Sequence, residues 1–355
     1  MSKAIVVIPG DGIGEEITAA AVAVLRRADH KHSLGLVFET HQAGGAALDL
    51  YGLPLPERTV AAARQADAIL LGAVGGPKWD AVQPELRPEK AILGLRKALG
   101  LYANLRPIRV PASLSEYSPL KPEIVSDIDI LIVRELTGGI YFGDHCEATV
   151  IDGVEKAWDI EVYSVPEVSR IVALACQAAT LRRGRVVSVD KANVLASSRL
   201  WRRTAEQAAE KYAGVTLSHM YVDNCAMQLA LAPKNFDVIV TSNLFGDILS
   251  DEAAVLGGSI GMMPSASLGE GPGLYEPIHG SAPDIAGKGI ANPVGAILSA
   301  AMLLRHSLTA ETAAVSIERA VDKVLADGYR TADLYRPGLT EVSTEDMARL
   351  IERNI

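Results

Sequence analysis

Two observations in the sequence predict an α/β fold. Short apolar runs rich in β-branched residues alternate with longer segments in which apolar residues recur every three or four positions. This alternation is typical of α/β proteins. The 355 residues are enough for two domains. No low-complexity linker separates two halves of the chain, which favours a discontinuous domain.

Hydrophobic periodicity locates the predicted elements. Five short apolar runs are predicted as strands: residues 5–8, 68–71, 130–133, 186–189 and 238–241. Three segments with helical spacing are predicted as helices: residues 15–28, 166–181 and 198–212. A strand-like run at 220–222 precedes a possible helix at 224–231. Residues 257–293 are rich in glycine, serine, proline and alanine, and we expect a long functional loop there.

Composition excludes several classes of protein. The 34 basic and 43 acidic residues give a net charge of −9, which argues against nucleic acid or an anionic membrane as the main partner. The longest uncharged stretch, residues 289–304, is too short for a membrane span. Three cysteines without a Cys-x-x-Cys pair are typical of a reducing compartment, and we expect a cytoplasmic protein.

A glycine-rich turn lies between the first predicted strand and the first predicted helix. Gly10, Gly12 and Gly14 suggest a dinucleotide fingerprint, but G-x-G-x-x-G requires glycine at position 15, which is Glu15. Asp11 would also repel phosphate. The pattern therefore favours a tight strand-to-helix turn over a standard Rossmann phosphate site.

Three aspartates are candidate metal ligands. The spacing of Asp247 and Asp251 places both carboxylates on one helix face. Asp223 follows a strand-like run and offers a third carboxylate. Such an oxygen set suits Mg²⁺ or Mn²⁺. The alternatives are that Asp247 and Asp223 cap helices and that Asp251 is a solvated residue of a first turn.

Charged and polar residues also follow other predicted strands. Arg134 ends an apolar strand and therefore needs a partner, which is either an internal carboxylate such as Glu135 or a substrate. With Arg96 and Arg106 it could clamp a substrate that carries two carboxylates. Tyr141 and Lys191 lie at turns after strands, where they are either structural or proton donors and acceptors.

Long motifs in a fixed order resemble the β-decarboxylating dehydrogenases that act on 2-hydroxy acids, and the isopropylmalate branch of that family in particular. The resemblance runs nearly end to end. The motifs are residues 75–80, 95–107, 134–143, 189–195, 221–223, 243–251 and 279–289. After residue 143 this chain departs from the branch, which often continues with proline, a basic residue and glycine, and it also has Ile160 where threonine is common.

The resemblance implies a two-domain α/β fold with a large twisted mixed sheet, and not a standard Rossmann fold. Residues 1–104 and 256–355 would form the first, cofactor-side domain, and residues 105–255 the second. An arm near residues 139–162 would complete a homodimer. Lys191 and Asp223 would then reach the active site of the other subunit.

The resemblance also implies a reaction: NAD-dependent oxidation and β-decarboxylation of 3-isopropylmalate in leucine biosynthesis. Lys191 would take the hydroxyl proton as hydride leaves for NAD, and Tyr141 would protonate the enolate after CO₂ has left. The substrate carboxylates would be held by Arg96, Arg106 and Arg134. Mg²⁺ or Mn²⁺ would be held by Asp223, Asp247 and Asp251, with Asp223 also lying against the substrate.

Cofactor and substrate choice follow from the matched residues. Asp284 would accept hydrogen bonds from the adenosine ribose of NAD and repel the 2′-phosphate of NADP. The remaining implied NAD contacts are Glu276, His279, Gly280, Ser281, Ala282, Ile285 and Asn292. The segment that faces C3 of the substrate would begin at Glu89, with Ile92 and Leu93 lining an apolar pocket. Alanine at position 91 would offer no ligand for the third carboxylate of isocitrate.

Two other functions remain open. A relaxed pocket would give a tartrate or D-malate dehydrogenase, because one methylene is worth only about 1–3 kcal/mol of discrimination. A non-catalytic regulatory subunit is disfavoured, because the acid, base, arginine and metal residues are all present.

Overall fold

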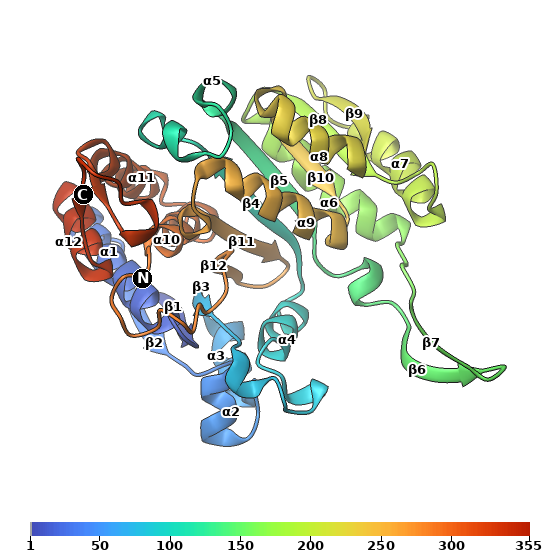
Figure 1. Ribbon diagram of the computed structural model, residues 1–355, viewed down its shortest axis with the longest axis horizontal. Helices are drawn as coiled ribbons and strands as arrows, with labels where there is room; N and C mark the ends of the chain where they lie inside the picture. Colours follow the sequence, from blue (N-terminus) through green and yellow to red (C-terminus); the bar gives the residue numbers. More distant parts are fainter. Residues whose placement is uncertain (1) are drawn as a thin grey trace. The chain divides into compact units, whose positions relative to one another are not determined.

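The computed structural model describes residues 2–355 and has the predicted mixed α/β character (Figure 1). Ten of its strands belong to one mixed sheet. The chain divides into two compact units. Unit 1 comprises the residues up to Leu101, Pro111–Pro119 and Ala254–Ile355; unit 2 comprises Tyr102–Val110 and Leu120–Ala253.

The sheet of unit 1 has the strand order β2-β1-β3-β12-β11. Neighbouring strands run parallel except for β12 and β11, which are antiparallel. The bounds are β1 Lys3–Gly10, β2 Leu36–Thr40, β3 Ala68–Ala73, β11 Pro264–Gly269 and β12 Gly273–Pro277. Strands β1 and β3 are almost continuously apolar, as expected when helices cover both faces of a parallel sheet.

Within residues 2–355, seven α-helices belong to unit 1. They are α1 Gly14–His32, α2 Gly45–Tyr51, α3 Glu57–Gln65, α4 Lys90–Ala98, α10 Val294–His306, α11 Glu311–Ala326 and α12 Thr344–Asn354. Short 3-10 turns accompany them: η1 Pro77–Trp79, η2 Pro84–Leu86, η3 Ala112–Tyr117, η6 Val255–Gly257, η7 Ile260–Met262 and η8 Ala332–Leu334, with the paired strands β13 Tyr329–Arg330 and β14 Thr340–Glu341.

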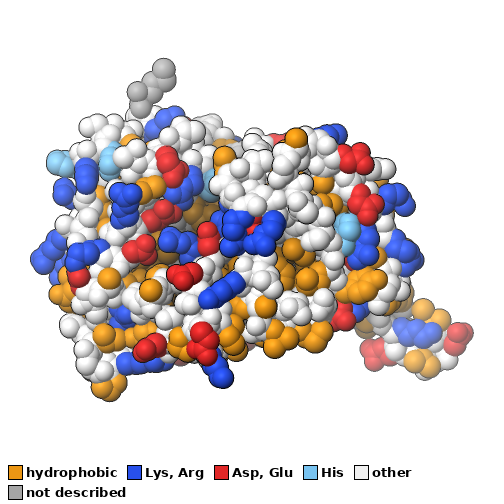
Figure 2. All heavy atoms as spheres, turned by 90° about the horizontal axis from the view of Figure 1, so that it is seen from above, with side chains coloured by type: hydrophobic (Ala, Val, Ile, Leu, Met, Phe, Trp, Pro, Cys, Tyr) orange, Lys and Arg blue, Asp and Glu red, His pale blue; other side chains and the backbone are white. Residues whose placement is uncertain are grey.

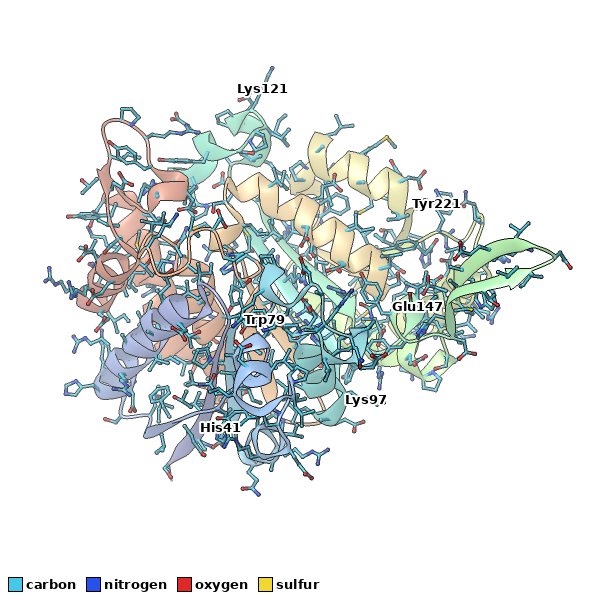
Figure 3. The ribbon with its side chains drawn as sticks, turned by 60° about the horizontal axis from the view of Figure 1, so that its bottom comes forward. His41, Trp79, Lys97, Lys121, Glu147 and Tyr221 are labelled. Carbon is cyan, nitrogen blue, oxygen red and sulfur yellow. The ribbon has the colours of Figure 1, made fainter. Side chains whose placement is uncertain are left out.

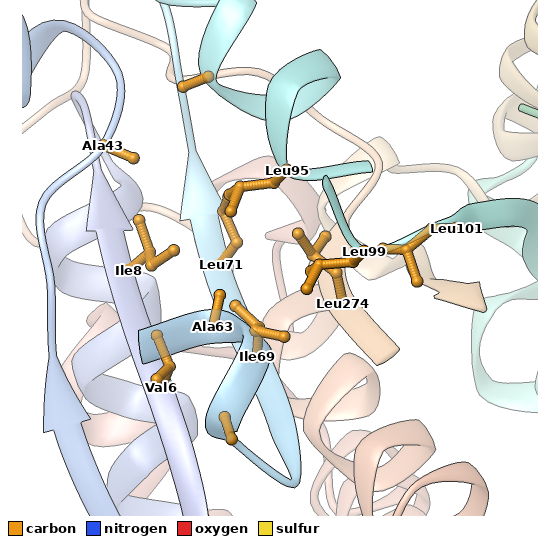
Figure 4. Close-up of a cluster of buried hydrophobic side chains, with 12 residues drawn as sticks. Val6, Ile8, Ala43, Ala63, Ile69, Leu71, Leu95, Leu99, Leu101 and Leu274 are labelled. Carbon is orange, nitrogen blue, oxygen red and sulfur yellow. The ribbon is translucent and has the colours of Figure 1, made fainter. Parts of the chain in front are cut away.

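Strand alternation builds the core on one face of this sheet. Every second residue of β1 and β3 points to the same side, where it packs against α3 and α4 (Figure 4). The buried cluster includes Val6, Ile8, Ala63, Ile69, Leu71, Leu95, Leu99, Leu101 and Leu274. The intervening residues, such as Ile5 and Leu70, are equally buried on the opposite side. The sheet is therefore an internal layer.

The expectation of one long loop over residues 257–293 is wrong for its first half. Residues there form η6, η7 and the antiparallel pair β11 and β12. Both strands are largely buried, so packing overrides the weak strand propensity of their glycine, serine and proline. The second half, after Pro277, does run without helix or strand as far as α10.

Unit 2 contributes the strand order β4-β5-β10-β8-β9. Strand β4 is antiparallel to β5, and the other neighbours are parallel. The bounds are β4 Leu101–Arg109, β5 Asp129–Glu135, β8 Arg185–Asp190, β9 Thr216–Tyr221 and β10 Val238–Thr241. The helices and turns of unit 2 are α5 Pro122–Val125, α6 Val165–Thr180, α7 Ala196–Ala209, α8 Val222–Leu231, α9 Asn243–Ala254, η4 Gly139–Tyr141 and η5 Pro233–Asn235.

The predicted strands and the three main helices are confirmed, with each end displaced by a few residues at most. Two capping alternatives are wrong. Helix α9 begins at Asn243, so Asp247 lies inside the helix and does not cap it. Helix α8 begins at Val222, so Asp223 lies in its first turn.

An antiparallel hairpin of β6 His145–Ile151 and β7 Val154–Asp159 projects away from the rest of unit 2 (Figure 1). Glu147 lies on it (Figure 3). In Figure 2 the hairpin is the lobe at the lower right, where apolar side chains lie beside acidic and basic ones. Its exposed apolar residues include Val150, at 69% exposure, Val154 and Trp158. A two-stranded hairpin is marginally stable in water by itself.

The described part of the chain, residues 2–355, contains no helix long and apolar enough to cross a membrane.

His219 on β9 should make the protein less stable in mild acid. Burial, with Arg202 nearby, lowers the pKa of this imidazole, and its Nδ1 atom is buried without a hydrogen bond. The unfolded chain therefore binds a proton below about pH 6.5 that the folded chain resists. The stability that the neutral His219 contributes is fully present above that pH and is lost as the pH falls toward the lowered pKa of the folded state.

The measurement is chemical denaturation at pH 7 and pH 5. His219→Gln, which keeps a donor for Glu206, should shrink the difference in unfolding free energy between the two pH values. The matched variant at an exposed position, His30→Gln, should leave that difference as it is. An unchanged difference in His219→Gln would show that this histidine is not responsible.

Candidate active site

The carboxyl ends of the parallel strands of unit 2 meet at one edge of the sheet. Arg134 near the end of β5 pairs in register with Thr241 of β10, and Thr241 pairs with Val189 of β8. The residues that follow these positions are Asn243 and Lys191. This edge is where α/β proteins bind their ligands.

Arg134 is almost fully buried, and its guanidinium group is held on two sides. Nε and Nη2 donate to Oδ1 of Asn243 at 3.1 and 2.9 Å, and Nη1 donates to Asp247. Glu135 is not its partner, because successive strand residues point to opposite faces. Glu135 instead accepts from the backbone of Thr137 and Gly138.

Arg106 on β4 approaches the same helix. Its Nε donates to Oδ1 of Asn104 at 2.7 Å, and its Nη1 donates to Ser250 at 2.6 Å and to Asp251 at 3.2 Å. Its Nη2 lies 3.5 Å from Asp247. Two arginines from neighbouring antiparallel strands thus converge on two carboxylates one helical turn apart.

Asp247 and Asp251 share one face of α9, as the sequence predicts. Their side chains are 35% and 59% exposed, so a cation from solvent can reach them. Burial raises the pKa of the Asp251 carboxyl, and Arg106 opposes the rise. This oxygen pair fits a hard divalent cation. Among residues 2–355 no three acidic, histidine or cysteine side chains lie close enough to hold a metal, so one chain assembles only two of the three expected ligands.

Tyr141 joins this cluster from η4. Its hydroxyl donates to Oδ2 of Asp247 at 3.0 Å, and Arg134 lies 5.8 Å from the centre of its ring. Burial, together with the charge of Asp247, raises the pKa of the Tyr141 phenol. The side chain is 47% exposed, so a protonated hydroxyl faces an accessible site.

Lys191 and Asp223 form a separate pair, with Nζ 2.6 Å from Oδ1. They meet because Asp190 pairs in register with Tyr221, and each of the two residues lies just beyond. Tyr221 is labelled in Figure 3. Lys191 lowers the pKa of the exposed Asp223 carboxyl. Buried Asp190 accepts from Arg202 and from the Ala192 backbone, which fixes the turn that presents Lys191.

Arg96, in α4 of unit 1, lies in a buried ion pair. Its Nη2 donates to Glu276 at 3.0 Å, whereas its Nε is buried and donates to no group in the described chain. A buried donor without a partner is costly. Because Nε belongs to a planar fork, a carboxylate ligand would satisfy it.

The two predicted pocket residues on α4 are placed differently. Leu93 shares one helix face with Glu89 and Arg96, at spacings of four and three residues. Ile92 packs against the core cluster of unit 1. Ala91 is fully buried. Of the two, Leu93 is therefore the better placed to meet a ligand held by Arg96.

The residues expected to contact NAD lie in unit 1, most of them between β12 and α10. His279 has a buried Nε2 without a hydrogen bond, Asp284 is exposed, and Ser281 donates to the Gly75 carbonyl at 2.7 Å. Oδ1 of Asn292 accepts from the backbone N–H of Val294, and its Nδ2 donates to Asp333. The exposed Asp284 carboxylate suits the hydroxyl groups of a ribose, and the unpaired Nε2 of His279 suits a nucleotide base. The other expected contacts, Gly280, Ala282, Ile285 and Glu276, lie in the same part of the chain.

The sequence did not indicate the structural roles of four supporting residues: Asn104, Asn243, Ser250 and Asp11. The carboxylate of Asp11 accepts three backbone N–H groups, from Gly45, Ala46 and Gly75. It thereby ties the turn after β1 to the first turn of α2 and to the loop after β3. Its location between two glycines was the only available signal. The neutral residues carry no electrostatic signal by themselves, and the arginine partners of Asn243 and Ser250 are distant in sequence.

Comparison with known proteins identifies the class of protein. The chain matches the isocitrate/isopropylmalate dehydrogenase family over residues 4–351, and it belongs to this family. The membership expected from the motifs is confirmed.

The curated relatives are more specific. The chain is 57% identical over 349 residues to a 3-isopropylmalate dehydrogenase of Xanthomonas euvesicatoria pv. vesicatoria, covering 98% of each protein. It is 56% identical to a 3-isopropylmalate dehydrogenase of Pseudomonas fluorescens, with coverage of 98% and 97%.

Solved structures agree on the fold. An isocitrate dehydrogenase from Methylococcus capsulatus has a TM-score of 0.88 at 36% identity, covering 99% of both chains. A β-decarboxylating dehydrogenase from Thermococcus kodakarensis has a TM-score of 0.81 at 38% identity, covering 99% of this chain and 96% of that one. The expectation of this family's fold in place of a standard Rossmann fold is confirmed.

Proposed function

We propose that this protein catalyses the NAD-dependent oxidation and β-decarboxylation of (2R,3S)-3-isopropylmalate to 4-methyl-2-oxopentanoate, CO₂ and NADH, a step of leucine biosynthesis. The observation that carries the proposal is the cluster of Arg134, Arg106, Tyr141, Asp247 and Asp251 at the sheet edge of unit 2. The full-length similarity to 3-isopropylmalate dehydrogenases supports the choice of substrate.

The arginines bind and orient the substrate. Arg106 and Arg134 would each turn a fork toward a carboxylate, and Arg96 would add its unpaired Nε. Asp247 and Asp251 would hold Mg²⁺ or Mn²⁺, which would supply positive charge for the substrate hydroxyl, and NAD would supply the hydride acceptor. Asp284 favours NAD over NADP, because a carboxylate repels the 2′-phosphate.

Proton transfer is assigned to two residues. Lys191 would take the proton of the C2 hydroxyl as hydride leaves C2 for the nicotinamide. The resulting 2-oxo acid loses its C3 carboxylate as CO₂, whose bonding electron pair stays on the organic fragment as an enolate. Tyr141 would then give its phenolic proton to C3 of the enolate. The raised pKa of Tyr141 keeps that proton available near neutral pH.

The active protein is proposed to be a homodimer with shared sites. One chain brings together Asp247 and Asp251, while Asp223 pairs with Lys191. A second copy that placed its Lys191 and Asp223 against this cluster would complete the ligand set. The hairpin of β6 and β7, with exposed Val150, Val154 and Trp158, offers an apolar surface for that copy.

The three cysteines are all unpaired, which supports a reducing compartment, and we place the protein in the cytoplasm.

The test is NADH formation by the purified protein with 3-isopropylmalate, D-malate, tartrate and isocitrate, each with Mg²⁺ and with a chelator. We expect a strong preference for 3-isopropylmalate that the chelator abolishes. A preference for D-malate or tartrate would reassign the substrate. An absence of turnover with all four acids would favour a regulatory role.

Leu93 should contribute to the choice of substrate. Replacing it with asparagine should lower kcat/KM for 3-isopropylmalate by roughly 10- to 200-fold, because a branched alkyl group then meets a polar side chain. Turnover of D-malate should hardly change. The matched variant is Leu50→Asn at an exposed leucine of α2, for which both substrates should behave as with the wild type. An equal loss for both substrates in Leu93→Asn would remove Leu93 from the pocket.

A further inference from the structure

Buried neutral amides orient both arginines of the unit 2 cluster. Asn104 and Asn243 are 0% and 1% exposed. The Oδ1 atom of Asn104 accepts from Nε of Arg106 at 2.7 Å, and that of Asn243 accepts from Nε and Nη2 of Arg134 at 3.1 and 2.9 Å. Since Nε lies at the base of the planar fork, these bonds fix the direction in which each fork points.

The two amides belong to the same part of the sheet. Asn104 of β4 pairs in register with Arg134 of β5, and Asn243 opens α9 directly after β10. Asn104 lies two residues before Arg106 on the same strand, and Asn243 follows the strand next to that of Arg134. The arrangement therefore depends on the backbone of the sheet and not on flexible loops.

Asn243 is itself fixed at three atoms. Besides accepting from Arg134, its Nδ2 donates to the Gly138 carbonyl at 3.2 Å, and its backbone N–H donates to the Tyr163 hydroxyl at 2.8 Å. A side chain that must accept on one side and donate on the other matches an amide and not a carboxylate.

Gly246 clears the path of the Arg134 stem. A Cβ atom at this glycine would lie 2.6 Å from Cγ of Arg134. The stem is thus confined by α9, while the head is held by Asn243. Both constraints come from the same helix.

Charge explains why an amide is better than a carboxylate in these positions. Arg106 and Arg134 carry two positive charges, and Asp247 and Asp251 carry two negative ones, so the group is formally neutral. A divalent cation would leave it with two positive charges, which matches a substrate with two carboxylates. One aspartate in place of either asparagine would remove half of that charge, and it would do so at a buried position next to the guanidinium group.

We propose that Asn104 and Asn243 are positioning residues that aim Arg106 and Arg134 at a dicarboxylate without neutralising them. The inference rests on the proposed function, because it takes the two arginines to be the substrate clamp. The proposal also explains why the group that accepts from Nε of each arginine is a neutral amide.

The experiment compares Asn104→Asp and Asn243→Asp with Asn235→Asp, a control at an exposed residue of the same unit. In the metal-loaded enzyme, the KM for 3-isopropylmalate should rise about tenfold or more in the first two variants. The KM for NAD should stay within about twofold. The affinity for Mn²⁺ alone, measured by paramagnetic resonance, should be unchanged or higher, because the added charge attracts a cation. The control should match the wild type in all three quantities.

Opposite changes in substrate and Mn²⁺ affinity distinguish positioning from simple damage to the fold. Serine variants at both positions separate the two parts of the argument: they stay neutral but are too short to hold the fork, so they should raise the substrate KM and leave Mn²⁺ affinity unaltered. Should an aspartate variant fail to fold, its serine counterpart provides the test.

The proposal is overturned if the substrate KM stays within about twofold of wild type in the folded variants, or if substrate and Mn²⁺ affinity fall together. Wild-type turnover is a separate outcome. If the wild-type enzyme oxidises another 2-hydroxy diacid, the proposed substrate is wrong, and the variants are then measured with that diacid.

Discussion

Replacing Lys191 with methionine should lower kcat by roughly 10²- to 10⁴-fold, the usual contribution of a positioned acid or base. Methionine keeps the length of the side chain and removes the proton acceptor. Thermal stability should change little, because Lys191 and Asp223 form an accessible ion pair at the surface of one chain. The measurement is steady-state NADH formation with saturating 3-isopropylmalate, Mg²⁺ and NAD, together with a thermal unfolding curve.

A complementation experiment tests whether Lys191 acts in the site of a second subunit. Tyr141→Phe removes the phenol that donates to Asp247 and should also be nearly inactive. If the sites are shared, a mixed dimer of Lys191→Met and Tyr141→Phe chains has one doubly altered site and one intact site. Random mixing after mild denaturation should therefore restore about a quarter of wild-type activity. Mixtures that stay as inactive as their components would show that both residues act in the site of their own chain.

Local patterns in the sequence predicted much of the framework and part of the site. The pairing of Asp247 with Asp251 depends only on helical periodicity, and the placement of Arg134 and Lys191 at strand ends depends only on short apolar runs. Such features need no knowledge of distant contacts, because the period of a helix or strand is set by the backbone.

Contacts between distant residues were less accessible. Glu135 was the obvious partner for Arg134, yet strand alternation turns adjacent side chains to opposite faces, and the true partners lie 109 and 113 residues further along the chain. Neutral residues such as Asn104 give no electrostatic signal in a sequence. Strands β11 and β12 were missed because burial, and not β-branched composition, makes them strands.

Replacing Gly143 with alanine should dissociate the proposed dimer. Gly143 lies at the base of the β6 and β7 hairpin, where an added Cβ would be 1.7 Å from the Ile160 carbonyl oxygen. The backbone at this point cannot move far enough to relieve the clash. The two strands must therefore separate at their base, next to the hydrogen bond from the Ile160 N–H to the Asp144 carbonyl. Since almost every residue of the hairpin is exposed within one chain, the rest of unit 2 should fold as before. The expected result is a monomer in sedimentation analysis that keeps its far-ultraviolet circular dichroism and loses NADH formation.

Gly153 provides the matched control for that experiment. It lies at the turn of the same hairpin with φ +73°, and an added Cβ would meet no atom within 4 Å. Gly153→Ala therefore adds only about 1–2 kcal/mol of left-handed backbone strain at the tip and leaves the base intact. This variant should remain dimeric and active. If both variants were dimeric and active, the hairpin would not govern assembly. If both were monomeric, the tip would matter as much as the base. If only Gly143→Ala dissociates the dimer, the contact between residue 143 and the Ile160 carbonyl is required for the shared active site. Loss of activity is then caused by a changed hairpin orientation and not by the loss of a glycine as such.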